Sequence, residues 1–156
     1  MNLSAMPLAN ESEDIVTNNG FYPDLDVAEL LKNYSVSNPL GANALAVVNA
    51  LALAIVSVNK DLMLYHAQNW LGVDTLADVE SEKVQDDTVL ILLYKHAVFT
   101  LAKSKLLVSR LTENNRDKAA ASAQDHIDNS KHWVYESNEA IYQIMNNAKN
   151  ISVALI

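Results

Sequence analysis

Helix breakers are scarce in this chain, which has only three glycines and three prolines among its 156 residues. An all-β sandwich or barrel turns about every 8–12 residues and usually places glycine or proline in those turns. Long helices are therefore the predicted secondary structure. Half of the residues are apolar, so a single domain of this length can bury a core.

Composition also excludes several classes of function. The chain has no cysteine, which rules out disulfides, cysteine-ligated zinc, iron–sulfur clusters and cysteine nucleophiles. Its three glycines, Gly20, Gly41 and Gly72, are too far apart to form a phosphate-binding loop. A net charge of −8 argues against a general nucleic-acid binder, because such a protein needs a basic face to displace counterions.

The spacing of apolar residues predicts four helices. The first is short and begins near Val27, with Asp24 or Asp26 as its N-cap. Longer helices are predicted at about residues 43–69, 88–112 and 116–147, and Asp86 or Asp87 is expected to cap the one at 88–112. Residues 70–87 form an acidic connection in which Asp74-Thr75 can open one short helical turn.

The expected fold is all-α, a small four- to five-helix bundle with an extended N-terminal arm and a C-terminal β-strand-like tail. The arm covers residues 1–20 and ends in the turn signal Asn18-Asn19-Gly20. The helical bundle covers residues 21–148, and the tail covers residues 149–156. In the tail, Ile151, Val153 and Leu155 alternate with Ser152, Ala154 and Ile156, and an isolated apolar strand needs a partner edge.

The most apolar segment, residues 40–58, carries no charge and is long enough to span a membrane. Asn43, Asn49 and Ser57 interrupt it, so we expect a buried helix and no membrane. The helices at 43–69 and 88–112 are apolar on more sides than four helices can cover, which favours subunit–subunit burial. The residues predicted for that interface are Leu51, Ile55, Val58, Leu92 and Phe99.

The search for a chemical site gives little. Asp128 and His132 have a spacing of four that a metal ligand pair permits, but an exposed carboxylate–imidazole contact is the expected reading. An enzyme or small-ligand binder needs convergent polar groups, and Tyr94, Lys95 and His96 are the candidates. We therefore predict no catalytic residue, no metal and no cofactor.

One basic cluster stands out in an otherwise acidic chain. Its members are Lys103, Lys105, Arg110, Arg116 and Lys118. The simplest interpretation is a solvated helix end. The functional interpretation is an electrostatic patch that faces nucleic acid or an acidic partner.

The order of these features resembles the head completion/stabilisation protein family of tailed phages with contractile tails. The resemblance rests on Phe21-Tyr22-Pro23-Asp24-Leu25-Asp26, on Thr75-Leu76-Ala77-Asp78-Val79 and on the terminal Val153-Ala154-Leu155-Ile156. It runs from about residue 21 to residue 156, and none of its pieces is a chemical motif.

The resemblance implies a structural virion protein of the neck, assembled in the host cytoplasm. It implies a homo-oligomeric ring of about twelve copies, the portal as the partner of residues 151–156, and a neck or tail-terminator protein on the other side. DNA would pass through the channel without sequence-specific binding. The alternative is a helical partner-binding or membrane-peripheral module that uses the apolar residues 44–58.

Overall fold

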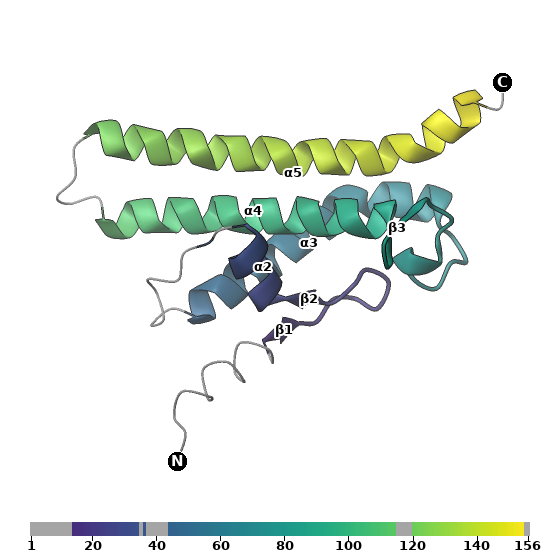
Figure 1. The fold of residues 1–156 in the computed structure, drawn as a ribbon, viewed down its shortest axis with the longest axis horizontal. Helices are drawn as coiled ribbons and strands as arrows, with labels where there is room; N and C mark the ends of the chain where they lie inside the picture. Colours follow the sequence, from purple (N-terminus) through teal and green to yellow (C-terminus); the bar gives the residue numbers. More distant parts are fainter. Residues whose placement is uncertain (1–13, 35, 37–43, 115–119, 155–156) are drawn as a thin grey trace, which may run out of the picture.

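Three long helices form the body of the protein in a computed structural model that describes residues 14–34, 36, 44–114 and 120–154. They are α3 (Ala44–Asn69), α4 (Val89–Asn114) and α5 (Ala120–Ala154). Helix α4 packs along α5 and also contacts α3, which crosses behind α4 in Figure 1 and touches α5 as well. A broadly all-α fold is confirmed, and two small antiparallel strand pairs add to it.

The first strand pair attaches the N-terminal part of the chain to the bundle. Strand β1 (Ile15–Val16) pairs with β2 (Leu25–Asp26), and the short helix α2 (Val27–Asn33) follows directly. Asp26 caps α2 by accepting a hydrogen bond from the backbone N–H of Ala28 at 2.9 Å, as predicted. Strand β1 lies within the expected arm of residues 1–20 and pairs with β2, while residues 1–13 of that arm lie outside the described residues.

The second strand pair lies in the acidic connection between α3 and α4. A short 3₁₀ turn, η2 (Leu76–Asp78), follows Thr75 as predicted, and β3 (Lys83–Val84) pairs with β4 (Asp87–Thr88). The prediction that Asp86 or Asp87 caps α4 is wrong. These residues belong to the hairpin, and the Thr88 hydroxyl accepts the hydrogen bond from the backbone N–H of Ile91 instead.

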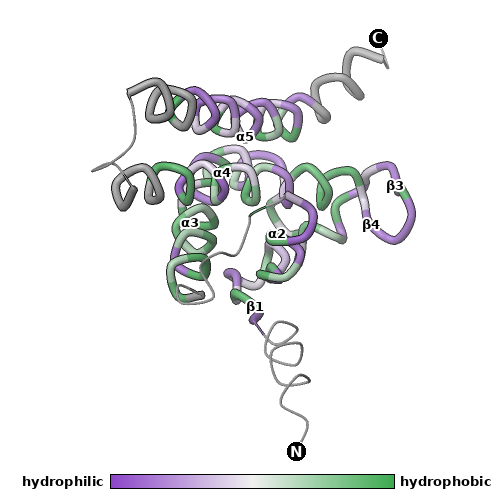
Figure 2. Tube along the Cα trace, turned by 60° about the vertical axis from the view of Figure 1, so that its left-hand side comes forward, coloured by the Kyte–Doolittle hydropathy of each residue, from purple (hydrophilic) through white to green (hydrophobic). Residues whose placement is uncertain are grey.

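The core joins the inner sides of α3, α4 and α5 to α2 and the first hairpin (Figure 2). Among its fully buried side chains are Leu25, Leu30, Leu51, Leu62, Leu76, Tyr94, Phe99 and Ile144. Four residues predicted for the subunit interface, Leu51, Ile55, Val58 and Phe99, lie in this single-chain core, whereas Leu92 is 39% exposed. Of the five predicted interface residues, Leu92 is therefore the one whose side chain remains exposed on the single chain.

Helix α5 packs closely on α4 through small residues. Ala97 and Ala140 are buried at this contact, and the Ser137 hydroxyl donates to the carbonyl oxygen of Ala97 at 2.7 Å. Ser104 and Ser130 also meet across the two helices, with 2.9 Å between their hydroxyl oxygens. Small side chains let the helix axes approach, and each hydroxyl finds a partner inside the contact.

The predicted strand-like tail is wrong for Ile151–Ala154, which form the end of α5. The predicted helix break at Asn146-Asn147 is also absent, because α5 continues through both residues. Extending an existing helix costs far less than nucleating a new one, so a polar pair without proline does not end it. Leu155 and Ile156 lie outside the described residues.

Candidate interaction surfaces

A buried polar network fixes the N-terminal hairpin to the bundle. The Tyr94 hydroxyl donates to the side-chain oxygen of Asn59 at 2.5 Å and accepts from the side-chain nitrogen of Asn18 at 2.8 Å. Asn59 also donates to Asn18 at 2.9 Å. Burial raises the pKa of Tyr94, so this phenol stays protonated and keeps its donor role at neutral pH.

Aromatic rings extend this attachment along α3. The Tyr22 ring stacks on Tyr94 with centroids 4.6 Å apart, and Phe21 lies against His66 at 4.0 Å and Trp70 at 5.7 Å. Phe21, Tyr22 and Trp70 are buried. The Phe-Tyr-Pro segment noted in the sequence therefore anchors the hairpin to the bundle.

The three polar residues considered for a ligand site do not converge. Tyr94 is committed to the buried network, and Lys95 forms ion pairs with Glu29 at 3.5 Å and Asp87 at 4.0 Å. His96 points to a different partner set, described next. Each of the three side chains therefore has a structural partner within the chain.

His96 connects α2, α4 and α5. Its Nδ1 lies 2.9 Å from the Tyr34 hydroxyl, and its Nε2 lies 3.3 Å from a carboxylate oxygen of Glu136. A hydrogen on Nε2 satisfies both contacts, because Glu136 can only accept it and the Tyr34 hydroxyl can donate to Nδ1. This arrangement holds the end of α2 against the two long helices.

The structure describes only part of the predicted basic cluster. Its first residue, Lys103, faces the bundle. Lys103 donates to the carbonyl oxygen of Tyr34 at 2.6 Å and lies 4.2 Å from the centre of the Trp133 ring. Desolvation lowers the pKa of Lys103. Lys105 is half-buried, the side chain of Arg110 is not described, and Arg116 and Lys118 lie outside the described residues.

Metal-ligating groups do not gather in the part of the chain that the structure describes. No set of three or more His, Asp or Glu side chains is close enough there to hold an ion. The spacing of Asp128 and His132 therefore has no third ligand among these residues, and the prediction of no metal site stays a prediction for the whole chain.

The most unusual surface is the outer side of α3. Five large apolar side chains there are each more than half exposed, and we call them the α3 outer face: Leu45, Leu53, Val56, Met63 and Leu64. Figure 2 shows the apolar character of this helix. The segment Leu45–Asn69 is long and apolar enough to cross a membrane by length and composition, although 39% of its most apolar stretch is buried in the protein.

Sequence reasoning missed this division of α3 into a core side and an exposed side. The helix is apolar nearly all round, so periodicity alone does not show which side the bundle covers. It also missed the network of Asn18, Asn59 and Tyr94, because these three residues are far apart in the chain and carry no local motif.

A comparison with known families identifies the chain's relatives. The model of the phage head completion protein (GPL) family matches residues 16–156. The chain belongs to this family. A probable head completion/stabilization protein of Haemophilus phage HP1 (strain HP1c1) is 30% identical over 130 residues, which is 83% of this chain and 84% of that protein. No solved structure gives a significant match.

The resemblance read from the sequence is thus confirmed. As a member of the GPL family, the chain is a structural bacteriophage protein with a role in head completion and is a component of the virion. The family is not a known class of enzyme. The surfaces described above are therefore best examined as contacts with other virion proteins.

Proposed function

We propose that this head completion protein is an adaptor of the phage neck, forming a ring of about twelve copies beneath the portal. The ring would join the DNA-filled head to a neck or tail-terminator protein and retain the packaged DNA. The observation that carries the proposal is the exposed apolar α3 outer face on a GPL family chain. Exposed apolar side chains that gather on one face are unfavourable in water and mark a contact with another protein.

The charge of the protein supports its proposed place around a DNA channel. A net charge of −8 repels the duplex, so DNA can pass without binding to a specific sequence. The basic residues Lys105, Arg110, Arg116 and Lys118 would then meet an acidic partner or the channel locally. Lys103 is already used inside the bundle.

Residues 151–156 are the proposed contact with the portal. Because Ile151–Ala154 are helical, the contact would be made by a helix end and not by an added strand. Figure 1 shows α5 continuing past the start of α4 at this end of the molecule, which supports a contact made by its last turns. About a dozen weak contacts of this kind would bind with high avidity.

Deletion of residues 151–156 tests the portal contact. We expect unchanged helical circular dichroism, because the described core residues of α5 end at Ile144, together with loss of attachment to portal-bearing heads. A shorter deletion of Leu155 and Ile156 alone serves as the graded control. Normal attachment of the longer truncation, or its unfolding, would contradict the proposal.

The apolar composition of α3 also favours a second candidate function, that of a peripheral membrane module. Flotation of the purified protein with phospholipid vesicles separates the two. The ring adaptor is expected to stay in the soluble fraction as an oligomer, whereas a membrane module floats.

A further inference from the structure

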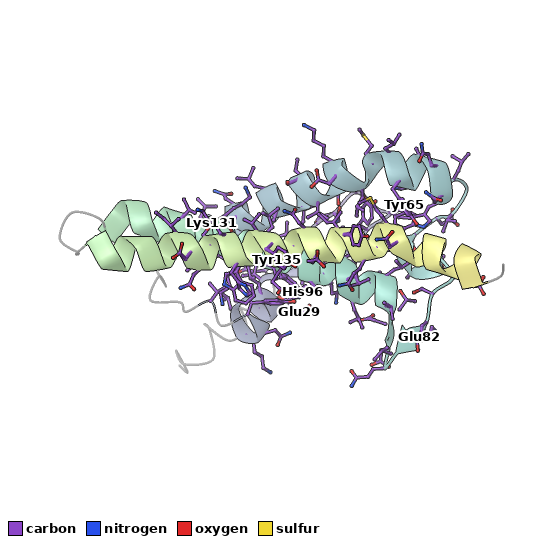
Figure 3. All side chains as sticks on the ribbon, turned by 90° about the horizontal axis from the view of Figure 1, so that it is seen from above. Glu29, Tyr65, Glu82, His96, Lys131 and Tyr135 are labelled. Atoms are coloured by element: carbon purple, nitrogen blue, oxygen red, sulfur yellow. The ribbon has the colours of Figure 1, made fainter. Side chains whose placement is uncertain are left out.

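Two exposed faces lie on different helices of the bundle. The first is the α3 outer face defined above. The second, which we call the α5 outer face, consists of Tyr135, Asn138, Glu139 and Tyr142; Tyr135 and Tyr142 are 60% and 59% exposed. Figure 3 looks down onto α5 and labels Tyr135 on it. The two faces belong to different helices, so one copy can offer both at the same time.

The two faces have the same spacing along their helices. Val56 and Met63 are seven residues apart, as are Tyr135 and Tyr142. In each case the interval is about 10 Å along the axis. A seven-residue interval keeps side chains on one side of a helix, which is the geometry of helices that pack at a shallow angle. Aromatic side chains are also enriched where proteins meet.

Each face carries a charged residue at the corresponding position within its seven-residue interval, and the two charges have opposite signs. Lys60 lies four residues after Val56 and three before Met63, and it is exposed. Glu139 lies four residues after Tyr135 and three before Tyr142, and it is partly exposed. The cation of the α3 outer face therefore matches the carboxylate of the α5 outer face. Pairing α3 with a second α3 would instead place Lys60 near another Lys60.

We infer that the α3 outer face of one copy packs against the α5 outer face of a second copy, with Lys60 paired to Glu139. This inference rests on the proposed ring and names the surfaces that build it. The contact is head-to-tail, so a pair of subunits keeps one free α3 outer face and one free α5 outer face and can continue the assembly until it closes.

Two exposed substitutions test the contact without disturbing the core. Val56→Asp disables the α3 outer face and Tyr135→Asp disables the α5 outer face. Both positions are more than half exposed, so each variant should keep the wild-type circular dichroism spectrum and thermal midpoint. We expect the wild-type protein to sediment as an oligomer, each variant to sediment as a 17.2 kDa monomer, and an equimolar mixture of the variants to stop at a dimer.

The mixture is decisive because each variant retains one intact face, so one contact can form but cannot be repeated. As the matched control, Leu71→Asp changes an 86% exposed apolar residue outside both faces and should leave assembly unchanged. Lys60→Glu and Glu139→Lys should each weaken self-association about tenfold, equivalent to about 1.4 kcal/mol. The double variant should restore it.

Several results would overturn the inference. A mixture that stays monomeric, or a Tyr135→Asp variant that still assembles while Val56→Asp does not, contradicts the pairing of α3 with α5. If both variants assemble like the wild type, the contact is wrong while the proposed ring stands. If the wild-type protein remains monomeric at every concentration, both the contact and the proposed ring are wrong.

Discussion

The hydroxyl of Tyr94 is the residue-scale feature with the clearest energetic consequence. Its removal in Tyr94→Phe leaves the side-chain oxygen of Asn59 without the hydrogen bond that it now accepts inside the protein. Asn59 is half-buried, so the loss of this hydrogen bond should cost about 0.5–1.5 kcal/mol. We expect the free energy of unfolding in urea to fall by that amount while helical content is unchanged.

Tyr22→Phe is the matched control for this prediction. Its ring stacks on Tyr94, but its hydroxyl lies 3.5 Å from Nδ1 of His66, which is a weak contact. The loss of unfolding free energy should be smaller than for Tyr94→Phe. Equal losses in the two variants would mean that the Asn18–Asn59–Tyr94 network does not hold the hairpin in place.

The contact between α4 and α5 decides stability at the scale of the elements. Ser137 is buried beside Ala97, so Ser137→Leu adds a branched side chain where the helices touch. Overpacking of this kind costs about 1–3 kcal/mol, to which the lost hydrogen bond adds. Urea unfolding should show this loss, whereas Ser137→Ala should cost only about 1 kcal/mol. A Leu variant as stable as the Ala variant would show that α5 can move freely on α4.

The long helices could be predicted from the sequence because their apolar residues recur over many turns. The prediction at residues 43–69 lies within one residue of α3. The strand pairs were missed because each strand has two residues, too few to show a period. The tail was misread for a related reason: Ile151, Ala154 and Leu155 are spaced at three and four, which suits a helix as well as a strand.

The sites were harder to predict than the helices. Apolar positions on α3 indicated burial but not which partner buries them, and so core residues such as Leu51 and Val58 were assigned to a subunit interface. Which side of α3 is buried depends on where α4 packs, and the tertiary structure decides this. Lys103 was placed in a basic patch because its charge is visible in the sequence, whereas its contact with Trp133 is not.

At the scale of the whole molecule, the tyrosines that join the first hairpin, α2 and α4 make the free energy of unfolding depend on pH. Burial raises the pKa of Tyr22 to about 12, and burial with the nearby Glu29 carboxylate raises that of Tyr34 to about 12. Burial raises the pKa of Tyr94 as well. In the unfolded chain a tyrosine loses its proton near pH 10. Between these values the folded state holds more protons than the unfolded state.

The sign of the pH dependence follows from this difference. A group whose pKa is raised by folding contributes stability that is complete below its unfolded pKa, here about pH 10, and that is lost as the pH rises through its folded pKa. Tyr22 and Tyr34 together should lower the free energy of unfolding by about 3 kcal/mol per pH unit between about pH 10 and 12. The lowered pKa of Lys103 acts in the opposite direction, and its effect ends near the unfolded lysine pKa of about 10.4.

We therefore expect the urea midpoint to be nearly constant from about pH 8 to 9.5 and to fall steeply above about pH 10. Helical circular dichroism and tyrosinate absorbance should change together, because the buried phenols ionise only when the bundle opens. Tyr22→Phe removes one of the raised groups at little structural cost, so its midpoint should fall less steeply in the same interval. A wild-type midpoint that stays flat to pH 12, or an equal slope in the variant, would show that these phenols are accessible in the folded protein and that the hairpin is not locked to the bundle.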